Sequence, residues 1–475
     1  MQDSSTGSIE AWVDDVEFRY DKTEIVNSRS TALRIRYLAP QREIYSRDVI
    51  AVVKGAETGL RDCAVYRIMC IETKGEGYGL KQVRVTDPPR GWLDDFLIPA
   101  IPAHLSIPKG EGGLPNIHVI VSTKSGLCKA KIFCDEIVRP VFSACGLKHD
   151  EDYMVHETES VHSVTEFART LLLPRANKGQ RQTVLLLSGD GAVVDIVNVL
   201  LSSSHSDAYV NPVIGLVVMG TGNALAHSTG LTNDDTMGFA SFLRKTPHSL
   251  PTFTARFSAG SVFVVDEGRG TEPIPQPEGS EAGVVSGAVV CSWALHAALV
   301  ADSDTSEFRK HGSDRFLMAA KGLLSPSDGS QPHRFTGKIT LLKKDENGKE
   351  VRTPLDRQEH MYILATLVSN LEQTLTISPS ARPLDGQLRL VHFVPVSGDE
   401  VLRIMDLAYH GGAHIKEDVV GYEDIDGLRI DFDEPDEHWR RVCVDGKIIR
   451  VGEAGWMEVR REERDVLDIV ANLGL

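Results

Sequence analysis

Short, mainly apolar runs alternate with small-residue loops in the middle of this chain. The clearest runs are Ile117–Val121, Val184–Leu187 and Val213–Met219. Each is short enough for a strand, and small residues and then an amphipathic stretch follow it. Strand, tight loop and helix repeating in this order predict a doubly wound parallel sheet. We therefore predict an α/β domain over residues 115–250.

On both sides of this region, apolar and polar residues alternate in the manner of β-strands. In residues 1–107 the alternation covers 33–38, 65–71 and 80–85, and it predicts a small β-rich module. Residues 108–113 are rich in Gly and Pro and contain no apolar residue, which is typical of a linker. Beyond residue 250 the strand-like segments are 252–257, 261–265, 337–342, 361–368, 388–394 and 442–451. They predict a β-rich domain over residues 251–475.

Length and composition bound the class of protein. A chain of 475 residues predicts two or three domains. The chain has 51 Lys and Arg against 67 Asp and Glu, a net charge of −16, and no strongly basic tail. Nucleic-acid affinity comes mostly from cationic side chains on phosphates, so we expect no general nucleic-acid binding. A local cationic pocket for a nucleotide is compatible with this charge.

Cysteine usage and hydropathy bear on location. The seven cysteines are scattered, odd in number and without a CxxC pair, which indicates reduced thiols in a cytoplasmic protein. Residues 1–5 lack the basic and apolar regions of a secretory signal. The sequence has no run of about 18 apolar residues that could span a membrane. We therefore expect any membrane contact to be peripheral.

Two glycine loops carry the strongest chemical signal. Ser188-Gly189-Asp190-Gly191 is followed 29 residues later by Gly220-Thr221-Gly222-Asn223, and each loop directly follows an apolar run. Glycines at the carboxyl ends of parallel strands let a phosphate approach the backbone N–H groups at a helix start. Asp190 lies inside this glycine cradle, where it would act as a general base or organise Mg²⁺. The alternative is a plain strand-to-helix turn with a capping aspartate.

A third candidate follows the apolar run that begins at Ser292. The run ends in Asp302 and Asp304, and Arg309 and Arg315 come soon after. The aspartates would lie at the lip of a core, and the two arginines could bind phosphate oxygens in bidentate fashion. The alternative is a solvated charged face.

Taken together, these residues resemble the diacylglycerol kinase catalytic-domain superfamily, and within it the sphingosine-kinase-like lipid kinases. The resemblance covers roughly residues 115 to 475. It implies an α/β nucleotide-binding domain followed by a β-sandwich domain that binds lipid, with ATP in the cleft between them. In the family's first nucleotide loop, usually Asn-Pro-x-x-G, this chain has Ser122–Gly126 with Asn and Pro replaced. In its late Asp-Gly-Glu segment the chain has Asp445-Gly446-Lys447.

The resemblance also implies roles for individual residues. Asp190 corresponds to the catalytic base, and Asp302 to the aspartate that meets the amino-alcohol head of the lipid. The implied nucleotide-binding residues are Ser122, Thr123, Lys124, Thr158, Ser188, Gly189, Gly191, Asp195, Gly220, Thr221, Gly222, Arg309, Arg315, Asp445 and Gly446.

The function expected on this basis is ATP-dependent phosphorylation of a lipid hydroxyl with Mg²⁺, the lipid being a sphingoid base. Diacylglycerol or ceramide is the alternative substrate. A catalytically inactive lipid-binding or scaffold protein of the same fold is the alternative from another class, and the replaced Asn-Pro and Lys447 motivate it. We expect a cytoplasmic protein with peripheral membrane contact; the sequence leaves its oligomeric state open.

Overall fold

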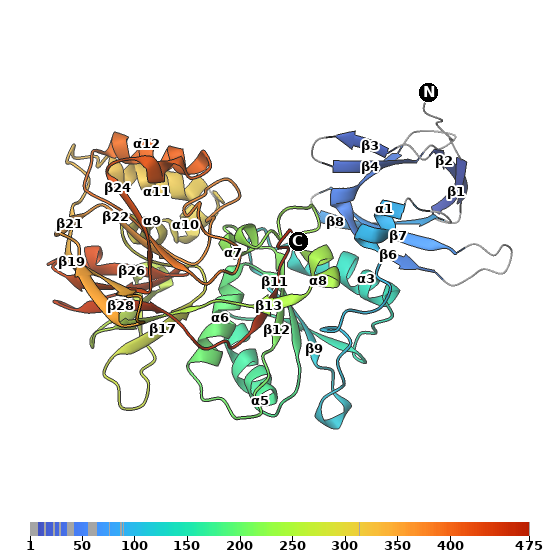
Figure 1. Ribbon diagram of the computed structural model, residues 1–475, viewed down its shortest axis with the longest axis horizontal. Helices are drawn as coiled ribbons and strands as arrows, with labels where there is room; N and C mark the ends of the chain where they lie inside the picture. Colours follow the sequence, from blue (N-terminus) through green and yellow to red (C-terminus); the bar gives the residue numbers. More distant parts are fainter. Residues whose placement is uncertain are drawn as a thin grey trace.

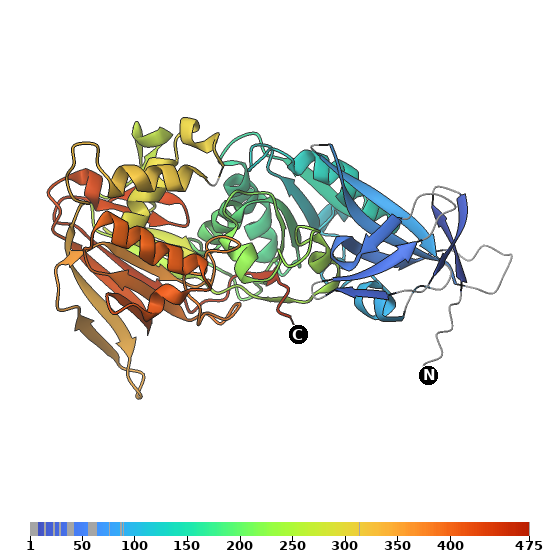
Figure 2. The same ribbon diagram turned by 90° about the horizontal axis from the view of Figure 1, so that it is seen from above.

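The computed structural model describes residues 8–13, 16–21, 24–27, 30–35, 42–55, 64–75, 77–85, 88, 90–312 and 314–474. For residues 8–43 and Arg309 it describes the backbone alone. Three regions follow one another along the long axis of the molecule: an N-terminal β-module, a central α/β domain and a C-terminal β-rich domain (Figure 1). The view from above shows the same order, with the α/β domain between the other two (Figure 2).

The N-terminal module is built from β-strands, as the alternation predicted, and these strands pair antiparallel. Residues 36–38 of the predicted segment 33–38 lie outside the described residues. One sheet has the order β2-β1-β8-β7-β6 and a smaller one the order β3-β4-β5. The helix α1 (Arg90–Phe96) closes the module with the buried side chains of Trp92 and Phe96. The strands are β1 (Ser8–Val13), β2 (Val16–Asp21), β3 (Glu24–Asn27), β4 (Ser30–Ile35), β5 (Arg42–Tyr45), β6 (Val49–Lys54), β7 (Tyr66–Lys74) and β8 (Gly77–Val85).

The central domain contains the predicted parallel sheet. Its strand order is β10-β9-β11-β12-β29-β13, with β9 to β12 and β29 parallel and β13 antiparallel. Its strands are β9 (Ile117–Val121), β10 (Tyr153–Glu157), β11 (Thr183–Ser188), β12 (Val213–Val218), β13 (Pro247–Ser249) and β29 (Asp468–Val470). Its helices are α2 (Ala130–Phe133), α3 (Arg139–Ala144), α4 (Ser163–Phe167), α5 (Leu173–Ala176), α6 (Asp190–Leu201), α7 (Ala224–Ser228) and α8 (Phe239–Arg244).

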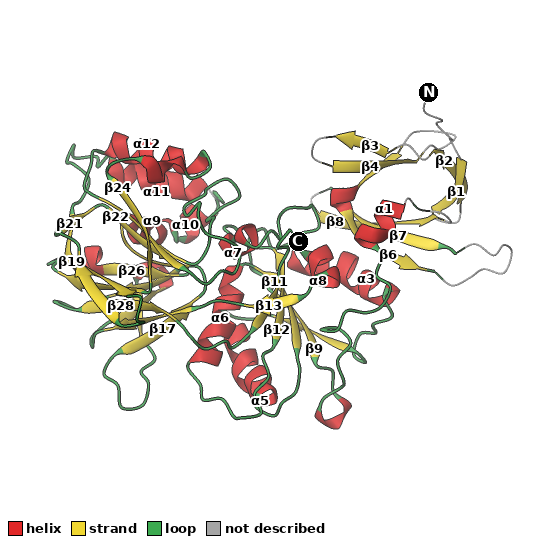
Figure 3. Ribbon diagram, viewed as in Figure 1, coloured by secondary structure: helices red, strands yellow, loops and turns green. Residues whose placement is uncertain are grey.

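Helices cover both faces of this sheet, which explains the nearly continuous apolar runs of β9, β11 and β12. Along β11, Leu185 and Leu187 pack with the aromatic residues of α2, α3 and α8. Val184 and Leu186 pack on the other side, with α4 and α6. The sheet and its helices are seen in Figure 3.

The end of the chain corrects one predicted boundary. Residues 251–475 were expected to form one β-rich domain, but β29 pairs with β12 and β13 and so belongs to the α/β sheet. The buried side chains of Ile469 and Val470 complete the central core there. A three-residue strand carries too little pattern for sequence periodicity to assign it to a sheet.

The C-terminal domain consists of two antiparallel sheets whose facing sides share one apolar core. The first sheet is β17 (Gly283–Gly287), β14 (Phe253–Phe257), β28 (Trp456–Arg461), β25 (Gly427–Phe432), β19 (Phe335–Lys344) and β20 (Glu350–Pro354), with β21 (Glu359–His360) beside β19. The second is β16 (Gly270–Pro273), β15 (Val262–Val265), β27 (Lys447–Arg450), β26 (Arg441–Val444), β18 (Val290–Ala294), β22 (Tyr362–Thr366), β23 (Leu388–Phe393) and β24 (Val420–Ile425).

Helices cover the outer face of the second sheet. They were not predicted from the strand-like alternation of residues 251–475. They are α9 (Leu295–Ser303), α10 (Ser306–Arg309), α11 (Asp314–Leu324) and α12 (Gly398–Tyr409). In Figure 1, α11 and α12 lie beside each other above this sheet. None of the helices in the described part of the chain is long and apolar enough to span a membrane.

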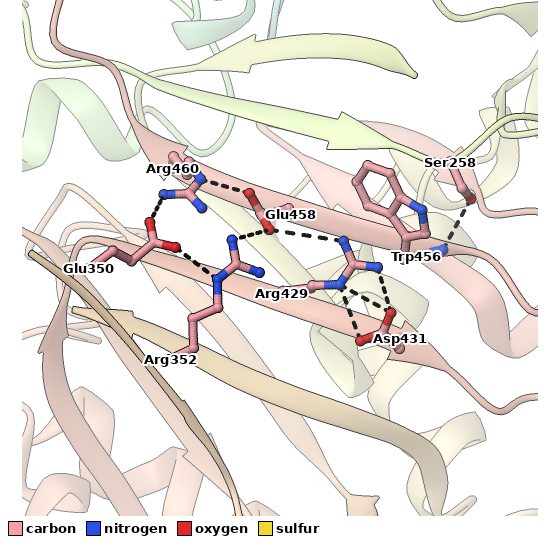
Figure 4. Close-up of polar contacts among 8 residues, drawn as sticks. All are labelled: Ser258, Glu350, Arg352, Arg429, Asp431, Trp456, Glu458 and Arg460. Atoms are coloured by element: carbon pink, nitrogen blue, oxygen red, sulfur yellow. Dashed lines mark hydrogen bonds and ion pairs between the residues drawn. The ribbon is translucent and has the colours of Figure 1, made fainter. Parts of the chain in front are cut away.

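The outer face of the first sheet, in contrast, carries a ladder of paired charges (Figure 4). Arg429 on β25 binds Asp431 at 2.7 Å and lies over the Trp456 ring, 4.4 Å from its centre. On the neighbouring strands, Arg460 bonds to Glu458 at 2.7 Å and to Glu350. Opposite charges that face each other across strands suit a solvated surface. This face therefore needs no further covering layer.

Candidate active site

Asp190 lies where β11 meets α6. Gly189 precedes it in an extended conformation, and Asp190 is the first helical residue. Its Oδ2 accepts a hydrogen bond from the Leu225 N–H at 3.0 Å, and the N–H groups of Ala224 and Ala226 also bond to the carboxylate. Its Oδ1 is buried and has no hydrogen-bond partner among the described residues. The carboxylate is thus fixed through one oxygen, and the other is left for a ligand.

The surroundings of Asp190 suit a proton acceptor. Burial raises the pKa of Asp190 to about 6, and the three backbone N–H groups act against this rise. A carboxylate with a pKa near the working pH accepts a proton more readily than one with an ordinary pKa. The capping alternative is not what the structure has, because Asp190 binds the backbone of α7 and not that of its own helix.

The two glycine loops meet, as their positions after neighbouring strands predicted. A Cβ atom on Gly220 would lie 2.6 Å from the Gly189 Cα, so the contact requires glycine. Asn223, in the left-handed region with a φ of 54°, donates from Nδ2 to the Gly220 carbonyl oxygen at 2.7 Å. Cβ atoms on Gly191 and Gly222 would meet no atom within 4 Å. The loops therefore close on each other at one point and leave free space beside Gly191 and Gly222.

The first predicted loop joins this arrangement from β9. Ser122 donates its N–H to the Leu187 carbonyl oxygen at 3.1 Å. Thr123 and Thr158 exchange two hydrogen bonds, of 3.2 and 2.9 Å, between the ends of β9 and β10. Lys124 is exposed beside them. The carboxyl ends of four parallel strands, β9 to β12, thus bring Thr123, Thr158, Ser188 and both glycine loops to one edge of the sheet.

Asp445 reaches the same place from the C-terminal domain. It forms the turn of the β26–β27 hairpin with Gly446, and the two have φ angles of 47° and 86°. Its carboxylate accepts the N–H groups of Ala288 and Val290, both at 2.6 Å, and that of Val289 at 3.1 Å. Burial and the nearby charge of Asp190 raise the pKa of Asp445 to about 7, against the effect of these hydrogen bonds. The two carboxylates therefore influence each other's protonation.

Two sets of polar contacts join α6 to the C-terminal domain. Lys447 donates to the Asp195 Oδ1 at 2.8 Å. Asn198 exchanges two hydrogen bonds with the Ser286 backbone, of 2.7 and 2.9 Å. The Asp195 side chain thus pairs with a protein cation, and the Lys447 that replaces the family's Glu has a structural partner. Both sets of contacts fix the helix that begins with Asp190.

An apolar cavity of about 570 Å³ opens from these carboxylates into the C-terminal domain. Asp190, Gly222, Asp445 and Gly446 line one part of it. Its remaining walls come mainly from α9, α11, α12, β22 and the loop 371–375, with the side chains Leu295, His296, Leu299, Val300, Phe316, Leu317, Ala320, Leu324, Tyr362, Leu371, Glu372, Leu375, Val401, Leu402, Met405 and Tyr409. The cavity is large enough for a small-molecule ligand and is lined as such sites usually are.

Of the residues predicted around Asp302, one lines the cavity and Asp302 itself does not. Arg315 lines the cavity and pairs with Asp304 at 3.4 Å. Asp302 does not line the cavity, and it forms an ion pair of 2.8 Å with Arg441. The Arg309 side chain lies outside the described residues. The substrate role of Asp302 stays a prediction, without a contact to the cavity.

Three cavity residues were not among the candidates from the sequence. His296 lines the cavity and bonds to Ser292 at 2.7 Å, and burial lowers its pKa to about 4. Glu372 and Tyr409 had no functional interpretation. The Tyr409 helix was visible in the sequence, because Ser397 followed by Glu400 is a capping box, and Ser397 accepts the Glu400 N–H at 3.3 Å. Glu372 lies in an irregular loop and carries no such signal.

One comparison with known proteins covers the central domain. The family model described as the diacylglycerol kinase catalytic domain matches residues 116–254. No curated protein sequence matches the chain. Two solved structures, a proposed and a named diacylglycerol kinase from Bacillus anthracis str. Sterne, are 14% and 12% identical, each aligned over 77% of this chain and 99% of theirs, with TM-scores of 0.49 and 0.45. Yeast NADH kinase complexed with NADH is 10% identical over 76% of this chain and 84% of its own, with a TM-score of 0.33.

The match spans β9 to the start of β14 and therefore contains all three predicted nucleotide loops and Asp190. Residues 116–254 belong to the diacylglycerol kinase catalytic-domain superfamily, and the domain is that of a kinase.

Proposed function

We propose that this protein is an ATP-dependent lipid kinase that phosphorylates the hydroxyl group of a single-chain lipid, a sphingoid base. The observation that carries the proposal is the apolar cavity with Asp190 and Asp445 in its wall. A phosphoryl acceptor with a hydrocarbon chain would place its hydroxyl at these carboxylates and its chain among the leucines. The kinase domain supplies the reaction class, and the cavity supplies the argument for a lipid.

The lining of the cavity favours a hydrocarbon chain. Its volume of about 570 Å³ lies within the range of small-molecule sites, about 300–1,000 Å³. We take one long chain as the proposed occupant and keep the two-chain lipids, diacylglycerol and ceramide, as the alternatives that the screen below tests.

The residues between the glycine loops fit the phosphates of ATP. Gly191 and Gly222 border free space, and Gly222 and Asp190 line the cavity. The described residues contain no cluster of three or more His, Cys, Asp or Glu side chains that could hold a metal. Mg²⁺ would therefore be held by the ATP phosphates with Asp190 as an oxygen ligand or neighbour, and when bound it neutralises phosphate charge.

Each part of the site has a distinct role in the proposed phosphoryl transfer. Asp190 accepts the proton of the lipid hydroxyl as that oxygen attacks phosphorus. The backbone of the two glycine loops positions the phosphates, and Arg315 adds positive charge at the cavity. The apolar walls keep water from competing with the lipid hydroxyl.

Peripheral membrane contact is part of the proposal. Leu317 on α11 is 54% exposed and Tyr409 on α12 is 46% exposed, and both also line the cavity. Met318 lies on the same helix and is exposed as well. A lipid could pass from a bilayer to the cavity along these side chains without crossing water.

A screen with labelled ATP, Mg²⁺ and separate lipids tests the proposal. We expect label in sphingosine and little in diacylglycerol or ceramide. Stronger labelling of diacylglycerol than of sphingosine would contradict a sphingoid-base substrate and would favour a neutral lipid as the substrate. No labelling of any lipid, together with absent ATP binding, would favour the inactive lipid-binding alternative.

A further inference from the structure

Glu372 is a carboxylate in the cavity wall that has no cationic partner. It is half-buried and lies between Leu371 and the loop residue Leu375, which also line the cavity. The Tyr409 hydroxyl donates a hydrogen bond to it. Within the described part of the chain, no Lys, Arg or His side chain forms an ion pair with it. Burial raises the pKa of Glu372, against the effect of the Tyr409 hydrogen bond.

The other half-buried carboxylates near the cavity differ from Glu372 in this respect, whereas Asp314, which also lines it, is exposed to water. Asp302 pairs with Arg441 at 2.8 Å, and Asp304 pairs with Arg315 at 3.4 Å. Asp190 and Asp445 are bound by backbone N–H groups. A partly desolvated carboxylate without a cation is costly, and the cost is relieved when a ligand supplies the positive charge. Glu372 is therefore a place where a cationic ligand gains binding energy.

Glu372 and Asp190 line the same cavity, and a short chain of contacts connects the segments that carry them. Asp190 binds the N–H of Leu225 on α7. Ser228, at the end of the same helix, exchanges two hydrogen bonds with the Asn370 backbone, of 3.0 and 3.2 Å. Glu372 follows Asn370 by two residues. A cation at Glu372 would therefore be carried by a ligand that occupies the same cavity as Asp190.

We propose that the Glu372 carboxylate binds the ammonium group of an amino-alcohol lipid and so selects it over neutral lipids of the same length. This inference rests on the proposed lipid kinase function. It assigns the head-group contact to Glu372 in place of Asp302, whose charge Arg441 already neutralises. Tyr409 is a positioning residue, because its hydroxyl orients the carboxylate.

The test compares two single-chain lipids that differ in one group, an amino alcohol and the diol with a hydroxyl in place of the amine. For the wild type we expect kcat/KM to favour the amino alcohol by about tenfold to hundredfold, the effect of one hydrogen bond to a charged group. Glu372→Gln keeps the shape and can still accept from Tyr409, and it should reduce this preference to within about threefold. The loss should lie mainly in KM, because the ammonium does not react.

Glu423→Gln is the matched control, because Glu423 is also half-buried but pairs with Lys343 at 2.6 Å outside the cavity. It should keep the wild-type preference. The proposal is overturned if Glu372→Gln keeps the preference too, or if Asp302→Asn loses it while Glu372→Gln does not.

Displacement of a fluorescent lipid by the same two compounds separates this proposal from the proposed function. If the wild type phosphorylates neither lipid, the kinase proposal fails. The Glu372 inference then stands if the wild type still binds the amino alcohol more tightly and Glu372→Gln does not. It falls if both proteins bind the two lipids equally.

Discussion

The central α/β domain contacts a neighbour on each side, and the two contacts are built from different groups. Towards the N-terminal module the contact is apolar. On β7, Ile68 and Cys70 face the interior of the module, whereas Met69 and Ile71 pack against the central domain. They join a core with aromatic residues of α2, α3 and α8, among them Phe133 and Phe239. Both faces of the strand are therefore buried, and the module shares its core with the α/β domain.

Towards the C-terminal domain, apolar packing is combined with buried polar groups and a cavity. Asp195 and Asn198 on α6 reach across to Lys447 and to the Ser286 backbone. Asp190 and Asp445 face each other's charge there, and the cavity opens beside them.

The difference indicates which contact is structural and which is chemical. An apolar contact is stabilised by removing surface from water and needs no special protonation state. Two neighbouring carboxylates with raised pKa values cost stability at neutral pH and are characteristic of functional sites. The comparison assigns catalysis to the cleft between the α/β and C-terminal domains, and assigns a supporting role to the N-terminal contact.

The largest effect is expected for Asp190→Asn. The amide keeps an acceptor for the α7 backbone but cannot take a proton, so the rate of lipid phosphorylation should fall by about 10²–10⁴-fold. Thermal unfolding should show that the fold is kept. Near-normal phosphorylation by this variant would contradict a catalytic role for Asp190 and for the cleft in which it lies.

A substitution in the contact between the N-terminal module and the α/β domain should lower the free energy of unfolding. Met69 is fully buried in the shared core, and Met69→Ala should lower the free energy of unfolding by about 2–5 kcal/mol. Because the core is shared, hydrogen exchange should accelerate in β6 and β7 and also in α3 and α8. Faster exchange confined to the module would contradict a shared core. Lipid phosphorylation by the remaining folded protein should be close to that of the wild type.

The Asp195–Lys447 pair should give the smallest change in stability. Both side chains are partly exposed, so Asp195→Ala or Lys447→Ala should cost less than about 1 kcal/mol in unfolding free energy. Each variant should nevertheless lower kcat, because the pair fixes the helix that carries Asp190. The double variant should lose no more activity than either single one. Additive losses would show that the two residues act separately.

Local patterns in the sequence predicted much of the central domain. The runs Ile117–Val121, Val184–Leu187 and Val213–Met219 became neighbouring parallel strands, because nearly continuous apolar runs are stable between two helical layers. Glycine at 189 and 220 was expected to let a phosphate approach the backbone; the structure adds that the two loops touch there, at a distance that leaves no room for a side chain. The kinase class followed from the same residues.

The cavity was much harder to predict, because its walls come from distant parts of the chain. The segment 442–451 read as one strand-like stretch, yet it turns at Asp445 and Gly446, and this turn is what places Asp445 near Asp190. The pairing of Asp302 with Arg441 depends on how α9 packs against β26, which no local spacing encodes. For the same reason, Glu372 could be recognised as unpaired only once its neighbours were known.

The most direct test of the account is the pH dependence of kcat/KM for lipid phosphorylation in the wild type and in Asp445→Asn. A proton acceptor works in its ionised form, so activity should rise with pH through the raised Asp190 pKa of about 6 and then level off. Asp445 has the higher pKa, about 7, and is mostly protonated where Asp190 ionises, so Asp445→Asn should leave the midpoint of this rise near pH 6. A profile that is flat or falls between pH 5 and 8, or a rise near pH 7 that Asp445→Asn abolishes, would contradict catalysis by Asp190.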